Sequence, residues 1–253
     1  MSLWVIADLH LSLSVNKPMD IFGGWDDYVS RLTENWQNSV KQDDVVVIPG
    51  DVSWEMNFED WLSKVQDQDI VLLPGDLTWA MHLEEAMEDI QRVGELPGRK
   101  LILRGNHDYW WNTMAKMNRF LDENNFNSIK ILNNNHYSYG EYGICGTRGW
   151  INESEVPADA KVLAREAQRL EMSIRSALDD GKKPIVFLHY PPIYANDYNY
   201  DIIDVLFKYD IKQCYYGHLH GKAHRFAVCG EYDGIDYQLI ASDFVQFAPK
   251  KIM

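Results

Sequence analysis

Short apolar runs alternate along the chain with longer segments of helical periodicity. Residues 3–7 are continuously apolar, as expected for a strand that is buried on both faces. Residues 25–40 then place apolar side chains three and four positions apart, which predicts an amphipathic helix that covers one face of a sheet. The alternation of strand and helix continues to the end of the chain and predicts an α/β fold.

One unit of this pattern occurs twice in succession, at residues 44–68 and 69–93. Each copy predicts a strand, a Pro-Gly-Asp turn and a helix, and the turns end in Asp51 and Asp76. Two copies are too few for a solenoid, which needs about three repeats to bury a continuous core. We therefore interpret the duplication as one extra strand–helix unit in a single domain of residues 1–253, since no linker or low-complexity tract divides the chain.

The remaining apolar runs predict a second set of strands and helices. We expect helices over residues 109–121 and 163–178, and strands, the first three of them antiparallel, over residues 129–132, 136–139, 142–146, 184–188 and 214–216. Residues 225–228, residues 237–241 and the tail are expected to be strands of a second sheet.

Composition excludes several classes of protein. Apolar residues make up 46% and charged residues 25% of the 253 residues, which is ordinary for a globular domain. The net charge of −14 argues against a general polyanion binder, because nucleic-acid affinity depends on Lys and Arg. The three cysteines lack a Cys-x-x-Cys spacing and are expected to be buried thiols in a reducing compartment. The sequence shows no signal peptide and no run of about 20 apolar residues, so a soluble cytoplasmic protein is expected.

Polar residues able to bind metals follow the predicted strands. Five of the eight histidines lie there beside Gly, Asp or Pro: His10, His107, His189, His218 and His220. Asp8 and His10 are two positions apart, so an extended chain directs both to the same side. For that pair alone, a turn-forming Asp beside a surface histidine is an equally good alternative. We expect the other three histidines, His82, His136 and His224, to be satisfied core residues.

The strand over residues 101–104 leads directly into Gly105-Asn106-His107-Asp108. Open α/β sheets place their sites at the carboxyl ends of strands. Asn106 can give an amide oxygen to a metal, His107 can donate a proton, and Asp108 can orient the imidazole of His107. Arg148, in a later loop, is a candidate phosphate-binding cation. Mixed nitrogen and oxygen ligands without thiolate favour Mn, Fe, Zn or Ni over calcium.

Taken in order, these motifs resemble those of the calcineurin-like metallophosphoesterase superfamily, and in particular a bacterial branch of predicted phosphohydrolases. The resemblance rests on Asp8-Leu9-His10, Gly75-Asp76, Gly105-Asn106-His107-Asp108, His189 and Gly217-His218-Leu219-His220. It implies a four-layer α/β/β/α sandwich of two mixed sheets flanked by helices, with a dinuclear metal site at the strand tips. Leu219 departs from many relatives, which have a smaller or polar residue there.

The resemblance also implies a ligand set and an activity. Asp8, His10 and His220 would hold one divalent ion, with Mn the first choice, and Asn106, His189 and His218 would hold the other. The expected activity is hydrolysis of a phosphomonoester or phosphodiester by a hydroxide that bridges the metals, with His107 as the acid and Asp108 as its orienting partner. A small phosphoester is the expected substrate; nucleic acid and membrane are not expected partners. The alternatives are a non-catalytic metal-binding scaffold of the same fold and a nuclease.

The duplicated unit leaves two candidates for the carboxylate that bridges the metals. We choose Asp76, because residues 76–106 fit one strand–helix–strand unit of about 30 residues. In addition, Glu55 follows Asp51 by four positions, whereas Ala80 holds the matching position after Asp76. A carboxylate near the metals would repel an anionic substrate. Asp51 is the alternative, and the oligomeric state is not indicated by the sequence.

Overall fold

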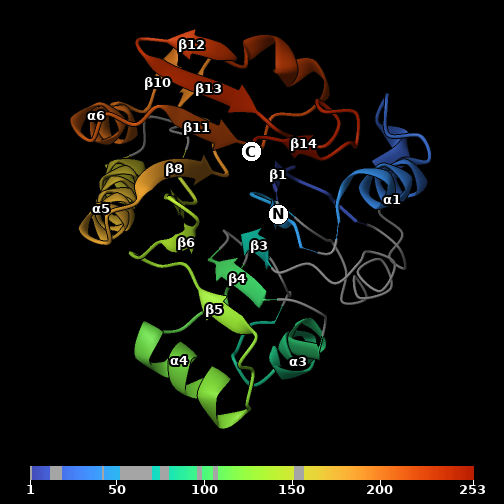
Figure 1. The fold of residues 1–253 in the computed structure, drawn as a ribbon, viewed down its shortest axis with the longest axis vertical. Coiled ribbons are helices and arrows are strands. Elements are labelled where there is room, and N and C mark those ends of the chain that lie inside the picture. The colour runs from blue at the N-terminus through green and yellow to red at the C-terminus, as the bar shows by residue number, and fades with distance from the viewer. Residues whose placement is uncertain are drawn as a thin grey trace. The chain divides into compact units, whose positions relative to one another are not determined.

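The computed structural model describes residues 2–11, 19–41, 43–51, 70–74, 80–95, 99–104, 108–150 and 157–253. The chain forms two compact units, which we call the first unit (Met1–Ile131 and Val245–Met253) and the second unit (Leu132–Phe244). Each unit contains a six-stranded sheet within the described residues (Figure 1). The α/β class predicted from the sequence is therefore confirmed, and both sheets are mixed, as expected.

The sheet of the first unit has the strand order β14-β1-β2-β3-β4-β5. Five strands are parallel: β1 (Leu3–Val5), β2 (Val45–Val47), β3 (Ile70–Pro74), β4 (Arg99–Leu103) and β5 (Ile129–Ile131). Their carboxyl ends therefore meet at one edge, where the predicted ligands follow. The last strand, β14 (Lys250–Lys251), pairs antiparallel with β1.

Two expectations about strand pairing were wrong. β5 is parallel to β4 rather than part of an antiparallel series, and the tail strand β14 completes the first sheet rather than the second. The two copies of the repeat do supply neighbouring strands, because β2 pairs with β3. The helix expected within the first copy lies outside the described residues.

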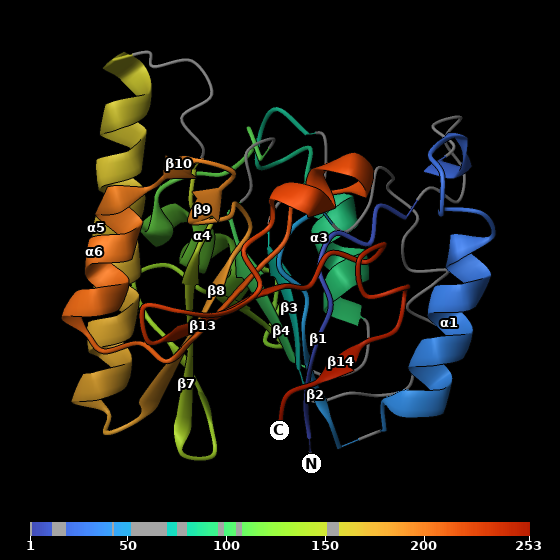
Figure 2. The ribbon, with the colours of Figure 1, turned by 90° about the horizontal axis from the view of Figure 1, so that it is seen from above.

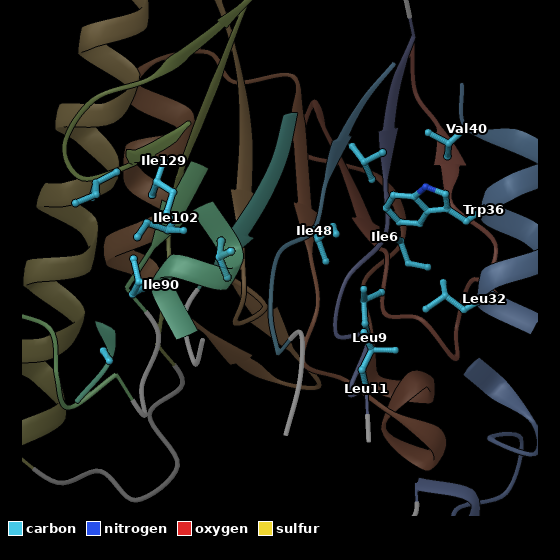
Figure 3. Packing of buried hydrophobic residues seen from close by; sticks show 14 of the residues in the cluster. Ile6, Leu9, Leu11, Leu32, Trp36, Val40, Ile48, Ile90, Ile102 and Ile129 are labelled. Atoms are coloured by element: carbon cyan, nitrogen blue, oxygen red, sulfur yellow. The ribbon is translucent and has the colours of Figure 1, made fainter. Parts of the chain in front are cut away.

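Apolar side chains of the parallel strands pack against helices in the first unit (Figure 3). Ile6, Ile48 and Leu32 belong to one buried cluster with Trp36, to which α1 (Tyr28–Ser39) contributes its apolar face. The short helix η1 (Met19–Ile21) precedes α1. Ile90 of α3 (Met87–Glu95) belongs to the same cluster, so the periodicity of the second repeat copy correctly predicted a helix.

The helix expected from residue 109 begins five residues later, as α4 (Met114–Glu123). Asp108 holds the intervening residues in a turn, because the Trp110 indole N–H donates to its Oδ1 at 2.9 Å and the Trp111 N–H donates to its carbonyl at 3.2 Å. Thr113 then caps the helix by accepting from the backbone N–H of Lys116 at 3.4 Å.

The sheet of the second unit has the order β12-β13-β11-β8-β7-β6. Its central strands are parallel: β7 (Tyr142–Thr147), β8 (Lys183–Leu188), β11 (Gln213–Tyr216) and β13 (Ile235–Leu239). The edge strands β6 (Tyr137–Tyr139) and β12 (Gly230–Tyr232) are antiparallel to their neighbours. A separate two-stranded hairpin joins β9 (Ile193–Tyr194) to β10 (Asp197–Tyr198).

Two helices, α5 (Pro157–Asp179) and α6 (Tyr200–Lys208), lie side by side and bury their apolar faces in the core of this unit (Figure 2). The sequence pattern predicted α5, whereas α6 was not predicted. Residues 225–228 were expected to be a strand. Instead, η2 (Gly221–Phe226) is a 3-10 helix, because the Ala223 and Ala227 N–H groups donate to nearby carbonyls of the same segment.

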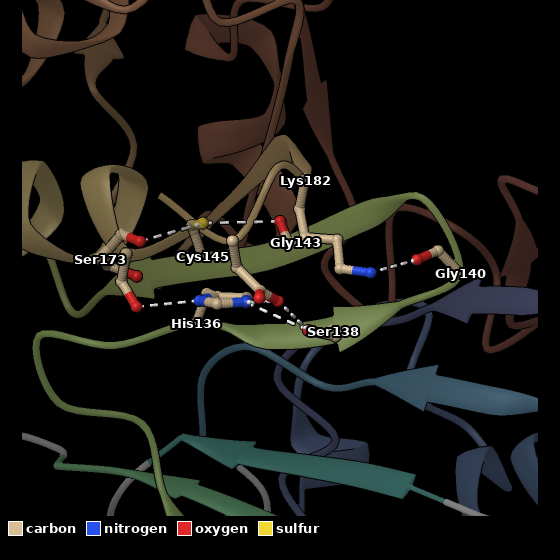
Figure 4. Close-up of polar contacts among 9 residues, drawn as sticks. His136, Ser138, Gly140, Gly143, Cys145, Ser173 and Lys182 are labelled. Carbon is tan, nitrogen blue, oxygen red and sulfur yellow. Dashed lines mark hydrogen bonds and ion pairs between the residues drawn. The ribbon is translucent and has the colours of Figure 1, made fainter. Parts of the chain in front are cut away.

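His136 packs in the second unit as the expected structural histidine (Figure 4). Its ring nitrogens lie 2.9 Å from the Ser176 hydroxyl and 3.1 Å from the Ser138 hydroxyl. Nearby, a Cβ at Gly143 would lie 2.6 Å from the Ala177 Cβ, so glycine is required for the close approach of α5 to β7. His82, by contrast, is exposed, and its expected burial was wrong.

The cysteines confirm the expectation of buried thiols at two of three positions. Cys145 and Cys214 are fully buried, and burial raises the pKa of the Cys145 thiol to about 12. Cys229 is exposed, contrary to expectation. In the described part of the chain, no helix combines the length and hydrophobicity needed to cross a lipid bilayer.

Candidate metal centre

The first pair of candidate ligands, Asp8 and His10, follows β1 in the first unit. Both are buried, and a ligand atom of each lies within 4.8 Å of the other. Their N–H groups donate to the Pro49 and Asp51 carbonyls at 3.1 Å, so the main chain after β2 fixes their position. The alternative of a surface histidine is wrong, because His10 is only 6% exposed.

The backbone at these ligands is in the left-handed region. Asp8 has a φ of 53° and His10 a φ of 46°, and His218 in the second unit has a φ of 71°. Such conformations cost roughly 1 kcal/mol or more for a residue with a Cβ, and they cluster at functional sites. Three predicted ligands thus share a strained backbone, which supports a binding role for this pair and for His218.

Aromatic residues before and within α1 hold His10 in place. The Trp25 ring meets the His10 ring edge-on, with 5.8 Å between the centroids. The Tyr28 hydroxyl donates to the His10 carbonyl at 2.7 Å. From the sequence, Trp25 and Tyr28 were recognised only as apolar helix positions, because their spacing carries no sign of a contact with residue 10.

Asp51 of the first repeat copy lies beside Asp8. Its backbone N–H donates to the Asp8 carboxylate at 3.0 Å, and β2 is the direct neighbour of β1. Three predicted site residues, Asp76, Asn106 and His107, lie outside the described residues. Asp108 is buried, and one of its carboxylate oxygens accepts from the Trp110 indole N–H.

The second unit brings His189 and His218 together. They follow β8 and β11, which are adjacent and parallel, with Leu188 opposite Tyr216. Their ring centroids are 4.9 Å apart, and the Gly217 N–H donates to the His189 carbonyl at 3.1 Å. The prediction that strand tips collect these imidazoles is correct within this unit.

The main chain of His189 is held by the loop that contains Arg148. The N–H groups of His189 and Tyr190 donate to the Arg148 carbonyl at 3.2 and 3.0 Å. A Cβ at Gly149, whose φ is +71°, would lie 3.3 Å from the Tyr190 carbonyl oxygen, so this approach favours glycine. The Arg148 guanidinium lies 3.9 Å from the buried Glu166 carboxylate and 4.7 Å from the Trp150 ring. These contacts are structural and give its suggested phosphate-binding role no support.

His220 is oriented by Asp243, a residue that sequence reasoning missed. Its Nδ1 lies 2.8 Å from Asp243 Oδ1, and the Gly221 N–H donates to Oδ2 at 2.8 Å. His224 Nε2 lies 3.2 Å from the same Oδ2, so His224 belongs to this network and is half-buried rather than a core residue. Burial acts to raise the pKa of Asp243, but the hydrogen bonds and charge of His220 and its neighbours outweigh burial and lower it.

The donors of each unit are of the kind that binds divalent transition-metal ions. Among the described residues, the first unit supplies one carboxylate and one imidazole, from Asp8 and His10, and the second unit supplies three imidazoles, from His189, His218 and His220. Because Asp243 engages Nδ1 of His220, Nε2 is the nitrogen available to an ion, as in the usual carboxylate–histidine–metal arrangement. Oxygen and imidazole ligands without thiolate suit Mn, Fe, Zn or Ni.

Two solved structures are similar to this chain. One is a protein of unknown function, AQ665, from Aquifex aeolicus, with 13% identity, a TM-score of 0.43, and coverage of 99% of this chain and 95% of that one. The other is phosphopantetheinyl hydrolase (PptH) from Mycobacterium tuberculosis, with 13% identity, a TM-score of 0.46, and coverage of 100% and 95%. None of the curated proteins compared with the chain matches it.

The family comparison covers the segment that carries every predicted ligand. The sequence model of the calcineurin-like phosphoesterases matches residues 1–222, from before Asp8 to beyond His220. The chain therefore belongs to the calcineurin-like phosphoesterase family.

Proposed function

We propose that the protein hydrolyses a small phosphomonoester or phosphodiester at a centre of two divalent metal ions. The observation that carries this proposal is a pair of candidate ligands at strand ends in each unit: Asp8 with His10, both buried, and the buried His189 with the half-buried His218. Membership in the calcineurin-like phosphoesterase family supports the same chemistry. The proposal includes the four-layer α/β/β/α sandwich implied by the family resemblance.

Seven residues would hold the two ions. Asp8, His10 and His220 are proposed for one site, Asn106, His189 and His218 for the other, and Asp76 as the bridge, with Asp51 as the alternative. When bound, such ions lower the pKa of a water molecule and offset charge on the phosphoryl oxygens. Manganese is the first choice, with Fe, Zn or Ni as alternatives.

The other residues of the proposed site would donate a proton to the leaving group or hold the metal-binding side chains in position. His107 is proposed to donate the proton that the leaving oxygen needs, with Asp108 as its orienting partner. Asp243 keeps the His220 ring in one orientation through its Nδ1 contact. Trp25 limits rotation of the His10 ring by its edge-on contact. His220 and His10 would thus be oriented before an ion binds, which reduces the ordering needed on binding.

The direct test is metal removal and replacement. Exhaustive chelation should abolish turnover of p-nitrophenyl phosphate and of bis-p-nitrophenyl phosphate, and Mn should restore it. Comparison of the two substrates distinguishes monoesterase from diesterase activity. Turnover that survives complete demetallation, verified by elemental analysis, would contradict the proposal. Stoichiometric metal binding with no turnover on a wide panel of phosphoesters would instead favour the non-catalytic scaffold.

The role of His107 has its own test. His107→Ala should lower kcat by about 10²–10⁴-fold, the usual contribution of a positioned acid, while the bound metal content stays unchanged. The loss should be larger for an alkyl phosphate than for p-nitrophenyl phosphate, because a good leaving group needs little protonation. An equal fall in kcat on both substrates would show that His107 does not act as the acid.

A further inference from the structure

A cavity with a volume of about 530 Å³ lies in the second unit, where α6, β10 and the β12–β13 hairpin meet. Aromatic rings dominate its lining, and four of them are large and exposed. Tyr198 is 38% exposed, Tyr200 67%, Phe207 46% and Tyr232 43%. Exposed aromatic side chains gathered in one place mark binding surfaces in soluble proteins.

Contacts among the aromatic side chains that line the cavity fix how they are arranged. Tyr198 and Tyr200 stack, with 5.8 Å between centroids and 17° between planes. A hydrogen bond with Tyr198 raises the pKa of Tyr232 and links the β9–β10 hairpin to the β12–β13 hairpin. The aromatic faces are therefore held by contacts within the lining itself.

Tyr237 gives the cavity a polar group at a buried position. The residue lies on β13, lines the cavity and is only 1% exposed. Within the described part of the chain, its hydroxyl has no hydrogen-bond partner. A buried hydroxyl without a partner destabilises a folded protein, so a ligand that supplies the partner would gain from it.

Charge then decides the chemical class of the ligand. The described lining contains two carboxylates, Asp204 and Asp233, and no basic side chain. Neither carboxylate forms an ion pair with any residue that the structure describes. Aromatic faces attract cations through the ring quadrupole, and nearby carboxylates add Coulomb attraction.

We propose that this cavity binds an organic ammonium ion that carries a hydrogen-bonding group, with the charged head among the aromatic rings and the polar group at Tyr237. Asp204 and Asp233 supply the countercharge. Choline has both features and serves as the probe. This site is additional to the proposed metal centre, because its lining contains none of the metal ligands.

The experiment is a calorimetric titration of the full, Mn-loaded chain with choline and with 3,3-dimethyl-1-butanol, its uncharged analogue of the same shape. Choline should bind at least about tenfold more tightly, because only it has the charge that the rings and carboxylates recognise. Raising the ionic strength should weaken choline binding and leave the alcohol unaffected. Equal affinity for the two compounds, or no binding of choline, would overturn the proposal.

Variants of the two carboxylates distinguish loss of their charge from damage to the fold. Asp233 has a φ of 50° and is exposed, and Asn tolerates that conformation, so Asp233→Asn removes the charge and keeps the turn. Asp233→Asn and Asp204→Asn should each weaken choline binding about 3–10-fold. The matched control is Asp210→Asn: Asp210 is also exposed, has a φ of 51° and lies outside the cavity lining, so this variant should bind choline normally.

Two further variants test how much the Tyr237 hydroxyl and the Tyr232 ring contribute to ligand affinity. Tyr237→Phe should weaken choline binding but not tetramethylammonium binding, which uses no hydroxyl. Tyr232→Leu should weaken both. If the three charge and ring variants changed only the self-association of the chain and not its affinity for choline, the aromatic surface would be an interface between copies and the proposal would be wrong. None of these binding measurements depends on phosphoester turnover.

Discussion

At the scale of single residues, the contact between Asp243 and His220 has the clearest consequence for metal binding. Asp243→Asn keeps the side-chain shape but replaces the charged acceptor of the His220 Nδ1 contact. Removal of such an orienting carboxylate commonly lowers metal affinity by about 10–100-fold. We expect that loss in a competitive Mn titration. Asp180→Asn is the matched control, because Asp180 contacts His136 at 3.4 Å outside the ligand set; a similar loss in that variant would point to a general effect on stability.

Lys100 provides a second prediction at the residue scale, and it concerns stability against pH. The residue is 2% exposed on β4, and burial lowers the pKa of its ammonium to about 8. In the unfolded chain the pKa returns to its ordinary value of 10.5. Between those values the unfolded chain holds the proton more tightly, so this residue increases the free energy of unfolding as pH rises from about 8 to 10.5 and opposes folding below that window.

Lys100→Met should therefore be more stable than the original protein at pH 7, by roughly 1–3 kcal/mol. The difference should shrink steadily as pH rises from 8 to 10.5. Urea unfolding of both proteins at a series of pH values measures it. Lys116→Met, which removes an exposed lysine on α4, is the control and should show no such dependence. A difference that stays constant with pH would mean that the buried charge is not its source.

At the scale of elements, the sequence predicted the strands, which depend on continuous apolar runs. It did not predict features that depend on one contact between particular side chains. The strands β1, β2, β8 and β11 and the polar residues that follow them were predictable, because buried parallel strands are mostly apolar and end in polar residues. The start of α4 was not, because it depends on the bond between Trp110 and Asp108. The link between Asp243 and His220 spans 23 positions and has no local signature.

The duplicated unit leads to a prediction about which carboxylate, Asp76 or Asp51, bridges the two metal ions. β3 borders β4, the strand that precedes Asn106, which agrees with the reason for choosing Asp76 as the bridge. β2 borders β1, and Asp51 touches Asp8, but this contact uses the Asp51 backbone N–H rather than its carboxylate. Replacement of the Asp51 side chain therefore leaves the contact available.

We accordingly expect Asp76→Ala to lose the second metal ion and turnover, and Asp51→Ala to keep both with at most a modest loss of stability. Metal content per chain, measured beside activity, distinguishes the two copies. The reverse result would assign the bridge to Asp51, in agreement with its position beside Asp8. Partial activity in both variants would mean that the two copies exchange places in solution.

At the scale of the whole molecule, the net charge of −14 predicts how the rate depends on salt. A small phosphoester is an anion, so the overall field of the protein opposes its approach, and added salt screens that field over about 10 Å at 0.1 M. For p-nitrophenyl phosphate, kcat/KM should therefore rise modestly, about twofold, between 10 and 150 mM KCl at constant Mn.

A nuclease would respond to salt in the opposite direction, because its affinity for a polynucleotide depends on cation release from the phosphates and falls steeply as salt is added. The same series with a single-stranded oligonucleotide, followed by fluorescence anisotropy, should show no binding at either salt concentration. A steep loss of oligonucleotide affinity with salt would instead establish a basic binding surface and favour the nuclease.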